Sequence, residues 1–267
     1  MSTDYHQDYA LLETTVRDAG DIARKFFKND VKSWEKKPGD PVSEADLAID
    51  THFREILTRA HPDYGWLSEE TVDDPARLTR SRVWVVDPID GTRSFIAGKP
   101  EFTICAALVE DGQPVLGIVY NPILEEFYEA ALGQGAKLNG VPIACSPKTD
   151  LKDGNFLTSR KTFEWHGWME EAPGARFSHV NSIAYRIAKV ASRHIDASLS
   201  FTAKSDWDIA AADIILSEAG GICTTTSGDP LVYNRKSVEH RNVISAGRAL
   251  HPALMGLLKS FGQEAGT

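Results

Sequence analysis

The chain has 267 residues, of which 42% are hydrophobic and 25% are charged, a composition typical of a globular protein with a sizeable core. Its formal net charge of −9 provides no basic excess for a phosphate backbone, so a nucleic acid polymer is not expected as a partner. A small anionic substrate is compatible with this charge, because a metal ion could supply the missing positive charge.

The first half of the chain predicts two helices followed by short strands. Apolar residues three and four apart indicate a helix over residues 9–27, and the polar stretch 29–41 is typical of a mobile loop. A second helix is expected to begin at Ser43, because Ser43-Glu44-Ala45-Asp46 has the pattern of a capping box. Strands are then predicted over 83–86, 102–109, 115–120 and 127–131, with a hairpin turn at Asn139-Gly140. Short strands joined by tight turns favour an antiparallel meander.

The second half alternates between strand-like and helical segments, which is typical of an α/β layer. We expect strands over 155–158, 177–180, 195–201, 222–226 and 243–245, and helices over 163–171, 183–192, 209–219 and 252–261. The change in pattern divides the chain into an N-terminal α+β domain, residues 1–145, and a C-terminal α/β domain, residues 146–267. The absence of a long linker suggests that the two domains pack tightly with a cleft between them.

The cysteines and the terminal segments indicate where the protein resides. Cys105, Cys145 and Cys223 are odd in number and widely spaced, which favours reduced thiols. The first ten residues lack the apolar segment of a signal peptide, and no apolar run reaches the ~18 residues of a membrane span. We therefore expect a cytoplasmic protein without a membrane partner.

The stretch WVVDPIDGTRSF, residues 84–95, places two aspartates directly after an apolar strand. Pro88 is expected to end the strand, Gly91 permits a sharp turn, and Thr92 could begin a short helix. Asp87 and Asp90 on one turn suit a hard cation such as Mg²⁺, and the Ile89 carbonyl could be a further oxygen ligand. The N–H groups at the start of the helix suit a phosphate oxygen. An ordinary surface turn, where Asp and Gly are common, is an open alternative.

Three further acids occupy similar positions. Glu69 follows an apolar run, Asp208 opens the helix over 209–219, and Asp46 lies in the first turn of an earlier helix. Taken singly, each has a simpler role: Glu69 as an exposed loop acid, Asp208 as an acid favoured by the helix dipole, and Asp46 as a cap. The sequence contains no G-x-S-x-G elbow, no H-E-x-x-H pair and no P-loop, so the corresponding chemistries are not indicated.

Taken together, these motifs identify a family. The stretch 84–95 resembles the D-P-I/L-D-G-T signature of the inositol monophosphatase family. Its second signature, W-D followed by a small-residue helix and E-A-G-G, is similar to Trp207-Asp208 and Glu218-Ala219-Gly220-Gly221. Two more elements match with serine substituted: Ser68-Glu69-Glu70 for G-E-E, and Ser43 through Asp46 for T-x-x-D. The resemblance spans roughly residues 10–250, with the elements in the family's order.

The resemblance implies a fold of the α+β/α/β class, a layered α-β-α-β-α sandwich. Its N-terminal half would hold an antiparallel sheet and its C-terminal half a mixed sheet. It also implies a Mg²⁺-dependent phosphate monoesterase that Li⁺ inhibits and that forms a homodimer. The implied metal ligands for two or three Mg²⁺ ions are Glu69, Asp87, the Ile89 carbonyl, Asp90 and Asp208. The implied catalytic group is Asp46, Thr92, Glu69 and Asp90, with Asp46 and Thr92 paired near the attacking water, and Gly91 and Thr92 would bind the phosphate.

Substrate choice rests on fewer residues. Many inositol-selective relatives carry a glutamate seven residues before the W-D aspartate, where this chain has Phe201. The expected substrate contacts are Asp90, Ser182, Ala184, Arg186, Phe201, Lys204 and Asp208. Lys204 and Arg186 favour a substrate with a second phosphate, such as 3′-phosphoadenosine 5′-phosphate, cleaved by the 3′(2′),5′-bisphosphate nucleotidase branch.

Several alternatives stay open. The enzyme could instead be an inositol-1-monophosphatase or a phosphatase of broad specificity for sugar phosphates and histidinol phosphate. A non-catalytic protein that binds a phosphorylated metabolite is an alternative of another class. The two residues that support the second phosphate also have simpler roles, Phe201 as a core residue at a strand end and Arg186 as an exposed helix position.

Overall fold

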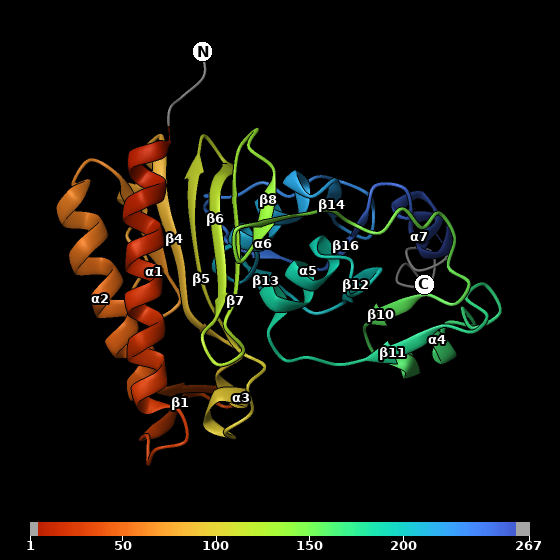
Figure 1. Ribbon diagram of the computed structural model, residues 1–267, viewed down its shortest axis with the longest axis horizontal. Helices are drawn as coiled ribbons and strands as arrows, with labels where there is room; N and C mark the ends of the chain where they lie inside the picture. Colours follow the sequence, from red (N-terminus) through yellow and green to blue (C-terminus); the bar gives the residue numbers. More distant parts are fainter. Residues whose placement is uncertain (1–4, 260–267) are drawn as a thin grey trace.

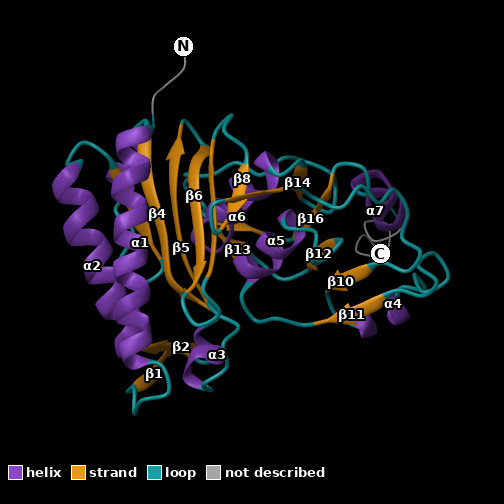
Figure 2. Ribbon diagram, in the orientation of Figure 1, coloured by secondary structure: helices purple, strands orange, loops and turns teal. Residues whose placement is uncertain are grey.

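The computed structural model describes residues 5–259, and within them helices and sheets alternate in five layers (Figure 1). Helices α1 (His6–Phe26) and α2 (Glu44–Ala60) cover one face of a seven-stranded sheet, here called the large sheet. Helices α5 (Ile183–Ala191) and α6 (Asp206–Glu218) lie between the large sheet and a five-stranded second sheet. The short α4 (Arg160–Trp165) and α7 (His251–Leu258) lie beyond the second sheet (Figure 2). The predicted α-β-α-β-α sandwich is confirmed.

The large sheet has the strand order β3-β4-β5-β6-β7-β8-β9. Its strands are β3 (Gly65–Ser68), β4 (Arg82–Asp90), β5 (Thr103–Glu110), β6 (Gln113–Asn121), β7 (Glu126–Ala131), β8 (Ala136–Leu138) and β9 (Val141–Ile143). From β4 onward every neighbour is antiparallel, which confirms the predicted meander and its Asn139-Gly140 hairpin. The first strand, β3, was not predicted, and it pairs with β4 in parallel. The sequence of β3, Gly-Trp-Leu-Ser, places its two apolar residues side by side and so shows no alternating pattern.

The second sheet is mixed, as predicted, with the strand order β11-β10-β12-β16-β14. Its strands are β10 (Asn155–Leu157), β11 (Arg176–Ser178), β12 (Ala197–Ser200), β14 (Gly221–Thr224) and β16 (Val243–Gly247). Strands β10, β11 and β12 are parallel to one another, whereas β16 is antiparallel to both β12 and β14. Two further strands, β13 (Lys204–Ser205) and β15 (Glu239–His240), form a short antiparallel pair beside α6.

The helix ends follow local sequence signals closely. Ser43 is the N-cap of α2, where its hydroxyl accepts a hydrogen bond and Asp46 accepts the Ser43 N–H at 2.8 Å, so the predicted capping box is confirmed. The predicted helix over 163–171 is shorter and earlier, as α4. The last helix was expected over 252–261; α7 ends at Leu258, and residues 260 and 261 lie outside the described residues.

The prediction of a mobile loop over residues 29–41 was wrong. Strands β1 (Ser33–Lys37) and β2 (Asp40–Ser43) form an antiparallel hairpin, in which Trp34 pairs with Val42. All five residues of β1 are exposed, so this strand carries no apolar alternation by which the sequence could reveal it. Backbone pairing with β2, whose last two residues are buried, holds it in place.

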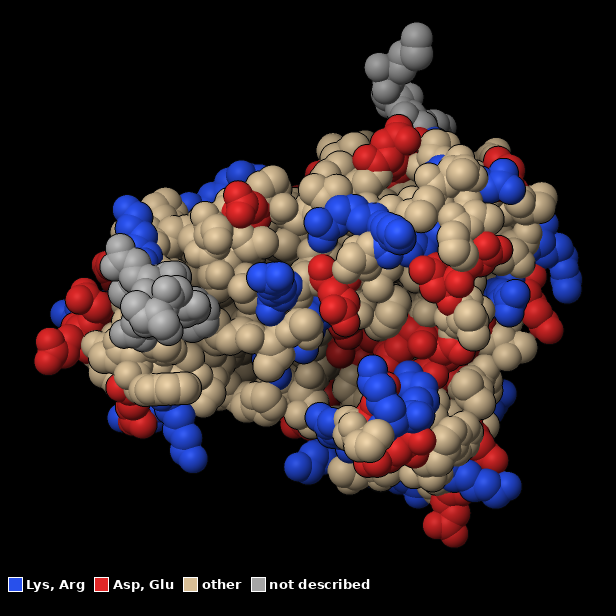
Figure 3. Space-filling model, turned by 180° about the vertical axis from the view of Figure 1, so that it is seen from behind, with Lys and Arg blue, Asp and Glu red and all other residues tan. Residues whose placement is uncertain are grey.

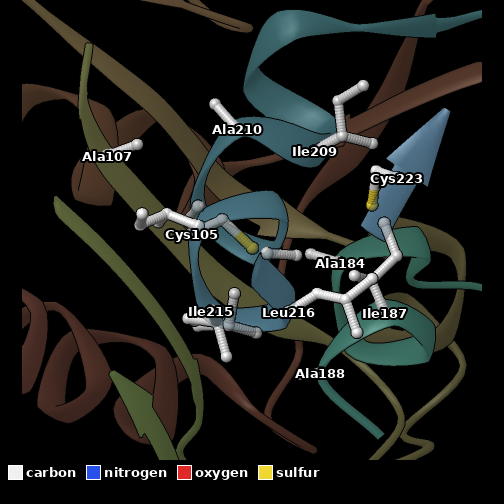
Figure 4. Close-up of a cluster of buried hydrophobic side chains, with 14 of the residues drawn as sticks. Cys105, Ala107, Ala184, Ile187, Ala188, Ile209, Ala210, Ile215, Leu216 and Cys223 are labelled. Atoms are coloured by element: carbon white, nitrogen blue, oxygen red, sulfur yellow. The ribbon is translucent and has the colours of Figure 1, made fainter. Parts of the chain in front are cut away.

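The core lies on both faces of the large sheet, because β4 is buried on both sides. Trp84 and Val86 face α1 and α2, whereas Val83 and Val85 belong to the core that includes α5 and α6. Figure 4 shows part of this second core, where Cys105 of β5 lies among small and branched side chains of α5 and α6. Gly117 of β6 permits the close approach of α6, since a Cβ there would lie 2.4 Å from the Ala211 carbonyl oxygen.

Two expectations about thiols and membranes can be compared with the structure. Cys105, Cys145 and Cys223 are all buried and free. None of the helices in the described part of the chain is both long enough and apolar enough to cross a membrane.

Candidate active site

The two aspartates of DPIDGT lie in a β-bulge at the end of β4. Asp87 is paired with Cys105 and Asp90 with Thr103, so three residue steps on β4 oppose two steps on β5. Side chains three residues apart normally point to opposite faces of a sheet, and the extra residue returns Asp90 to the face of Asp87. Both carboxylates therefore point to the α5 and α6 side, while Ile89 enters the core beside α1 and α2. Pro88 does not end the strand as predicted, because a bulge tolerates its missing N–H.

Asp208 joins these aspartates from the first turn of α6. One carboxylate oxygen from each of Asp87, Asp90 and Asp208 lies within 4.8 Å of the others. Asp87 Oδ1 accepts the Ile89 N–H at 3.0 Å, and Asp208 accepts the Ser205 N–H at 2.6 Å. These anchors fix carboxylates from the N-terminal and C-terminal halves of the chain in one cluster.

Asp90 is anchored by α5. Its Oδ2 accepts the Ser182 hydroxyl at 2.7 Å and the Ala184 N–H at 2.7 Å. Ser182 is also the N-cap of α5, where its hydroxyl accepts the Tyr185 N–H at 3.0 Å. Ser182 and Ala184 were expected as substrate contacts, and in the structure they hold a carboxylate of the cluster.

Asp46 and Thr92 form a buried pair next to the cluster. The Thr92 hydroxyl lies 3.2 Å from Asp46 Oδ1 and 3.0 Å from the Ile89 carbonyl oxygen, and it can donate to either. Asp46 Oδ2 accepts the Ser43 hydroxyl at 2.5 Å. Thr92 opens α3 (Thr92–Ile96), preceded by Gly91 with a φ of 100°, a backbone conformation that strongly favours glycine. The predicted short helix after the turn is confirmed.

Glu69 lies at the edge of the cluster with a cation from the hairpin. Lys36 Nζ lies 2.9 Å from Glu69 Oε1 and 2.9 Å from Glu70 Oε1. Sequence reasoning did not select Lys36 or Glu70 as site residues. Only the fold of the β1–β2 hairpin brings Lys36 to the end of β3, and no local signal in the sequence indicates that approach.

Burial raises the pKa of five carboxyl groups in and beside the cluster. Burial first, and neighbouring carboxylates second, raise the pKa of Asp208 to about 7 and that of Asp87 well above its usual range. Burial likewise raises the pKa of Asp90 to about 6, of Asp46 to about 6 and of Glu70 to about 7. A cluster of like charges that repel one another is suited to a multivalent cation, which would relieve the repulsion.

The donor set fits a hard divalent cation. Asp87 Oδ2 is buried and has no hydrogen-bond partner among the residues that the structure describes. A buried carboxylate oxygen without a partner is costly, and coordination of a metal ion would satisfy it. Carboxylate and carbonyl oxygens are the ligands that Mg²⁺ prefers in proteins.

The cluster lies in a cavity of about 280 Å³. Figure 3 shows Asp and Glu side chains gathered in a hollow of the surface, with Lys and Arg side chains on its rim. Among the residues that line the cavity are Gly91 and Thr92, together with the polar side chains of Arg93, Asn181 and Lys204. The site therefore combines an acidic floor with cationic groups beside it.

The remaining predicted substrate residues lie in different surroundings. Lys204 and Asp208 line the cavity, whereas Arg186 and Phe201 are not among its lining residues. The Arg186 guanidinium donates to the Val180 carbonyl and lies 3.4 Å from His179 Nδ1. Phe201 packs at the edge of the core behind the second sheet, with its ring centroid 6.2 Å from that of Trp168. Substrate contact by these two residues stays a prediction.

Comparison with known proteins agrees with this geometry. The sequence model of the inositol monophosphatase family matches residues 4–263. A protein of Mesorhizobium japonicum named inositol-1-monophosphatase is 33% identical, over 94% of this chain and 96% of its own. The 3′(2′),5′-bisphosphate nucleotidase CysQ of Aggregatibacter actinomycetemcomitans is 31% identical, over 83% of this chain and 85% of its own. The solved structure of an IMPase from Thermotoga maritima superposes with a TM-score of 0.80 at 28% identity, covering 97% of this chain and 99% of that one. The chain therefore belongs to the inositol monophosphatase family, and it is a phosphoric monoester hydrolase.

Proposed function

We propose that this enzyme hydrolyses a small phosphate monoester with Mg²⁺ held by Glu69, Asp87, the Ile89 carbonyl, Asp90 and Asp208. The observation that carries the proposal is the convergence of three carboxylates within 4.8 Å, with one buried oxygen that has no partner in the described part of the chain. The family resemblance implies two or three Mg²⁺ ions. When bound, they would lower the pKa of a water molecule and neutralise charge on the phosphate. Phosphoryl transfer depends mainly on positioning and charge neutralisation, which this donor set supplies.

The protein's own groups would position the attacking water and take its proton. The Thr92 hydroxyl, donating to Asp46 Oδ1, can accept a hydrogen bond from a water molecule in the cavity. As water attacks phosphorus, its proton would pass to Thr92 Oγ1 while the threonine proton passes to Asp46. A pKa of about 6 lets Asp46 be ionised near neutral pH and still accept a proton. Gly91 and Thr92 would contact the phosphate through the backbone N–H groups at the start of α3.

We further propose 3′-phosphoadenosine 5′-phosphate as the preferred substrate. Lys204 supports this choice, because it lines the cavity and its ammonium group donates to two neutral oxygens, Thr202 Oγ1 at 3.2 Å and the Ala203 carbonyl at 3.1 Å. An ammonium group bonded in this way can exchange these partners for a second phosphate. The similarity to CysQ points in the same direction.

Inositol 1-phosphate is the second candidate substrate, supported by the similarity to the Mesorhizobium enzyme. The test is phosphate release with Mg²⁺ from 3′-phosphoadenosine 5′-phosphate, inositol 1-phosphate, histidinol phosphate and fructose 1,6-bisphosphate. We expect the highest kcat/KM for the nucleotide, and a KM about 10-fold higher in Lys204→Met because a charge-assisted hydrogen bond is lost. Lys161→Met, at an exposed position of α4, is the matched control.

Each outcome of the panel has a distinct meaning. A preference for inositol 1-phosphate, unchanged in Lys204→Met, would contradict the proposed substrate and leave the reaction intact. If Mg²⁺ supports no release from any ester while a metabolite raises the melting temperature, the chain would be a binding protein rather than an enzyme.

Assembly, inhibition and location belong to the same proposal. We propose a homodimer and inhibition by Li⁺, both by analogy with the family, and a location in the cytoplasm, which the three free cysteines support. Light scattering of the purified chain tests the homodimer, and titration of LiCl into the phosphatase assay tests the inhibition. A monomeric mass, or activity insensitive to LiCl, would contradict the respective analogy.

A further inference from the structure

The segment that carries Lys204 and Asp208 is held in place from behind the cavity. In the β13–β15 pair, Lys204 lies opposite His240 and Ser205 opposite Glu239. The Asp206 N–H donates to the Val238 carbonyl at 2.9 Å, which continues the attachment into the first turn of α6. Two cavity residues four positions apart therefore depend on one short loop for their backbone position.

A buried carboxylate strengthens this attachment. Asp206 is 1% exposed, and its Oδ1 lies 2.8 Å from His240 Nε2. Its Oδ2 accepts the Asn234 N–H at 2.7 Å, so both carboxylate oxygens have partners in the loop that follows β14. His240 is 4% exposed and lies with its ring centroid 5.3 Å from that of Tyr233. Neither Asp206 nor His240 is among the cavity-lining residues, so neither can touch a substrate there.

The same loop is joined to the strands of the acidic cluster. Asn234 has a φ of 53°, a left-handed conformation that asparagine tolerates better than most residues. Its Oδ1 accepts Arg77 Nη1 at 2.6 Å, and Arg77 is 2% exposed. Arg77 lies in the 3₁₀ helix η1 (Pro75–Thr79), which connects β3 to β4. The connection between the strand before Glu69 and the strand of Asp87 is thus bonded to the loop behind Asp208.

We propose that Arg77, Asn234, Asp206 and His240, here called the α6 support network, are positioning residues for the metal ligand Asp208. Asp208 comes from the C-terminal half of the chain and Asp87 from the N-terminal half, so their carboxylates meet only if α6 is held in register with β4. Groups behind metal ligands commonly control affinity by fixing the orientation of the ligands. The inference rests on the proposed role of Asp208 as a metal ligand.

The test measures Mg²⁺ binding directly, by calorimetry on the full chain. His240→Met removes the hydrogen bond at similar side-chain volume, and His240→Gln keeps an N–H near the position of Nε2. His251→Met is the matched control, because His251 also has a hydrogen-bond partner at Nε2, the Thr224 hydroxyl at 2.8 Å, but lies on α7. We expect Mg²⁺ affinity to fall about 10-fold or more in His240→Met, to recover largely in His240→Gln, and to equal the native value in His251→Met.

Asp208→Asn separates failure of the inference from failure of the proposed function. If Asp208→Asn binds Mg²⁺ as the native chain does, the proposed metal site is wrong. If Asp208→Asn binds weakly while folded His240→Met binds normally, the positioning inference is overturned. Kinetics provide a second measurement. If saturating Mg²⁺ restores most of kcat in His240→Met, the inference is supported, because a misplaced ligand lowers Mg²⁺ affinity more than it slows the chemical step.

A second variant covers the case in which His240→Met does not fold. Asn234→Gly keeps the left-handed backbone and the N–H to Asp206, but removes the side chain that Arg77 contacts. We expect about 3-fold weaker Mg²⁺ binding from this variant, in line with the loss of one outer contact. Native affinity in folded Asn234→Gly would contradict the link through Arg77.

Discussion

Replacing Asp87 with asparagine should stabilise the metal-free enzyme at pH 8 while it removes most of the response to Mg²⁺. The Asp87 carboxylate is 1% exposed, and its Oδ2 has no partner among the described residues. Asparagine has nearly the same shape, can still accept the Ile89 N–H, and would place an NH₂ group toward the carboxylates of Asp90 and Asp208. A repulsive contact in the empty site would become an attractive one.

The magnitude follows from the spacing of the charges. Two unit charges at the 4.8 Å limit of the cluster repel by about 3 kcal/mol at an effective dielectric constant of ~20. Proton uptake relieves part of this repulsion, so we expect a gain of about 1–3 kcal/mol in the free energy of unfolding at pH 8. With an unfolding entropy of about 2.1 cal/mol/K per residue, this gain corresponds to a rise in Tm of about 2–5 °C.

The sign of the pH dependence gives a second check. The folded-state pKa values of Asp87, Asp90 and Asp208 lie above their unfolded values, so the folded protein holds protons that the unfolded chain releases. The stabilising contribution of Asp90 and Asp208 is complete below about pH 4 and is lost as pH rises through about 6 and 7, and that of Asp87 is lost in the same direction. The advantage of Asp87→Asn over the native chain should therefore shrink between pH 8 and pH 5.

The assay is calorimetric unfolding in EDTA and in Mg²⁺. The native chain at 100 times its Kd for Mg²⁺ should gain about 2.7 kcal/mol, and the variant should gain little. Asp18→Asn, at an exposed position of α1, controls for the change in net charge. The reasoning is refuted if Asp87→Asn is less stable than the native chain in EDTA, or if Mg²⁺ raises its Tm as much as that of the native chain.

Three further predictions follow from the same contacts. Thr92→Val removes the hydroxyl that bonds Asp46, so kcat should fall about 100-fold while calorimetry shows Mg²⁺ affinity nearly unchanged; a comparable loss in both would place Thr92 among the metal ligands. With Mg²⁺ below saturation, activity should decline as pH falls through about 7 to 6, because protonated Asp208 and Asp90 release metal, and added Mg²⁺ should move this decline to lower pH. Gly91→Ala should lower stability by about 1–3 kcal/mol in urea unfolding, since a residue with φ of 100° cannot carry a Cβ without strain; an unchanged midpoint would show that the turn relaxes.

Local signals in the sequence predicted the elements that local contacts define. The capping box at Ser43 and the hairpin at Asn139-Gly140 need only neighbouring residues, and both were found. The hairpin of β1 and β2 was not predicted, because its exposed first strand is specified by backbone pairing and not by burial. The strand β3 escaped because four residues, Gly65–Ser68, gain their strand character from the parallel pairing with β4.

The site could be predicted only in pieces. The spacing of Asp87 and Asp90 indicated a metal site, but Asp208 lies more than 100 residues away, and only the family resemblance placed it with them. Arg186 and Phe201 were chosen by their positions relative to the family's substrate residues, and the structure has them bonded to a carbonyl and packed against Trp168. Lys36 contacts Glu69 because the chain folds back on itself, and no periodic pattern of apolar residues predicts a contact of this kind.

The order of residues in DPIDGT is set by the two faces of β4. Val83 and Val85 point toward α5 and α6, so Asp87 continues that alternation toward Asp208, while Ile89 fills the core on the opposite face. Without the bulge, Asp90 would point to the same face as Trp84 and Val86, into the apolar layer beside α1 and α2, where a carboxylate would be buried among apolar side chains. The bulge turns Asp90 back to Ser182 and Ala184, and Gly91 then reverses the chain so that Thr92 meets Asp46. The bulge is therefore the feature that lets two aspartates three positions apart share one face of the sheet, and it also frees Ile89 to fill the core on the other face.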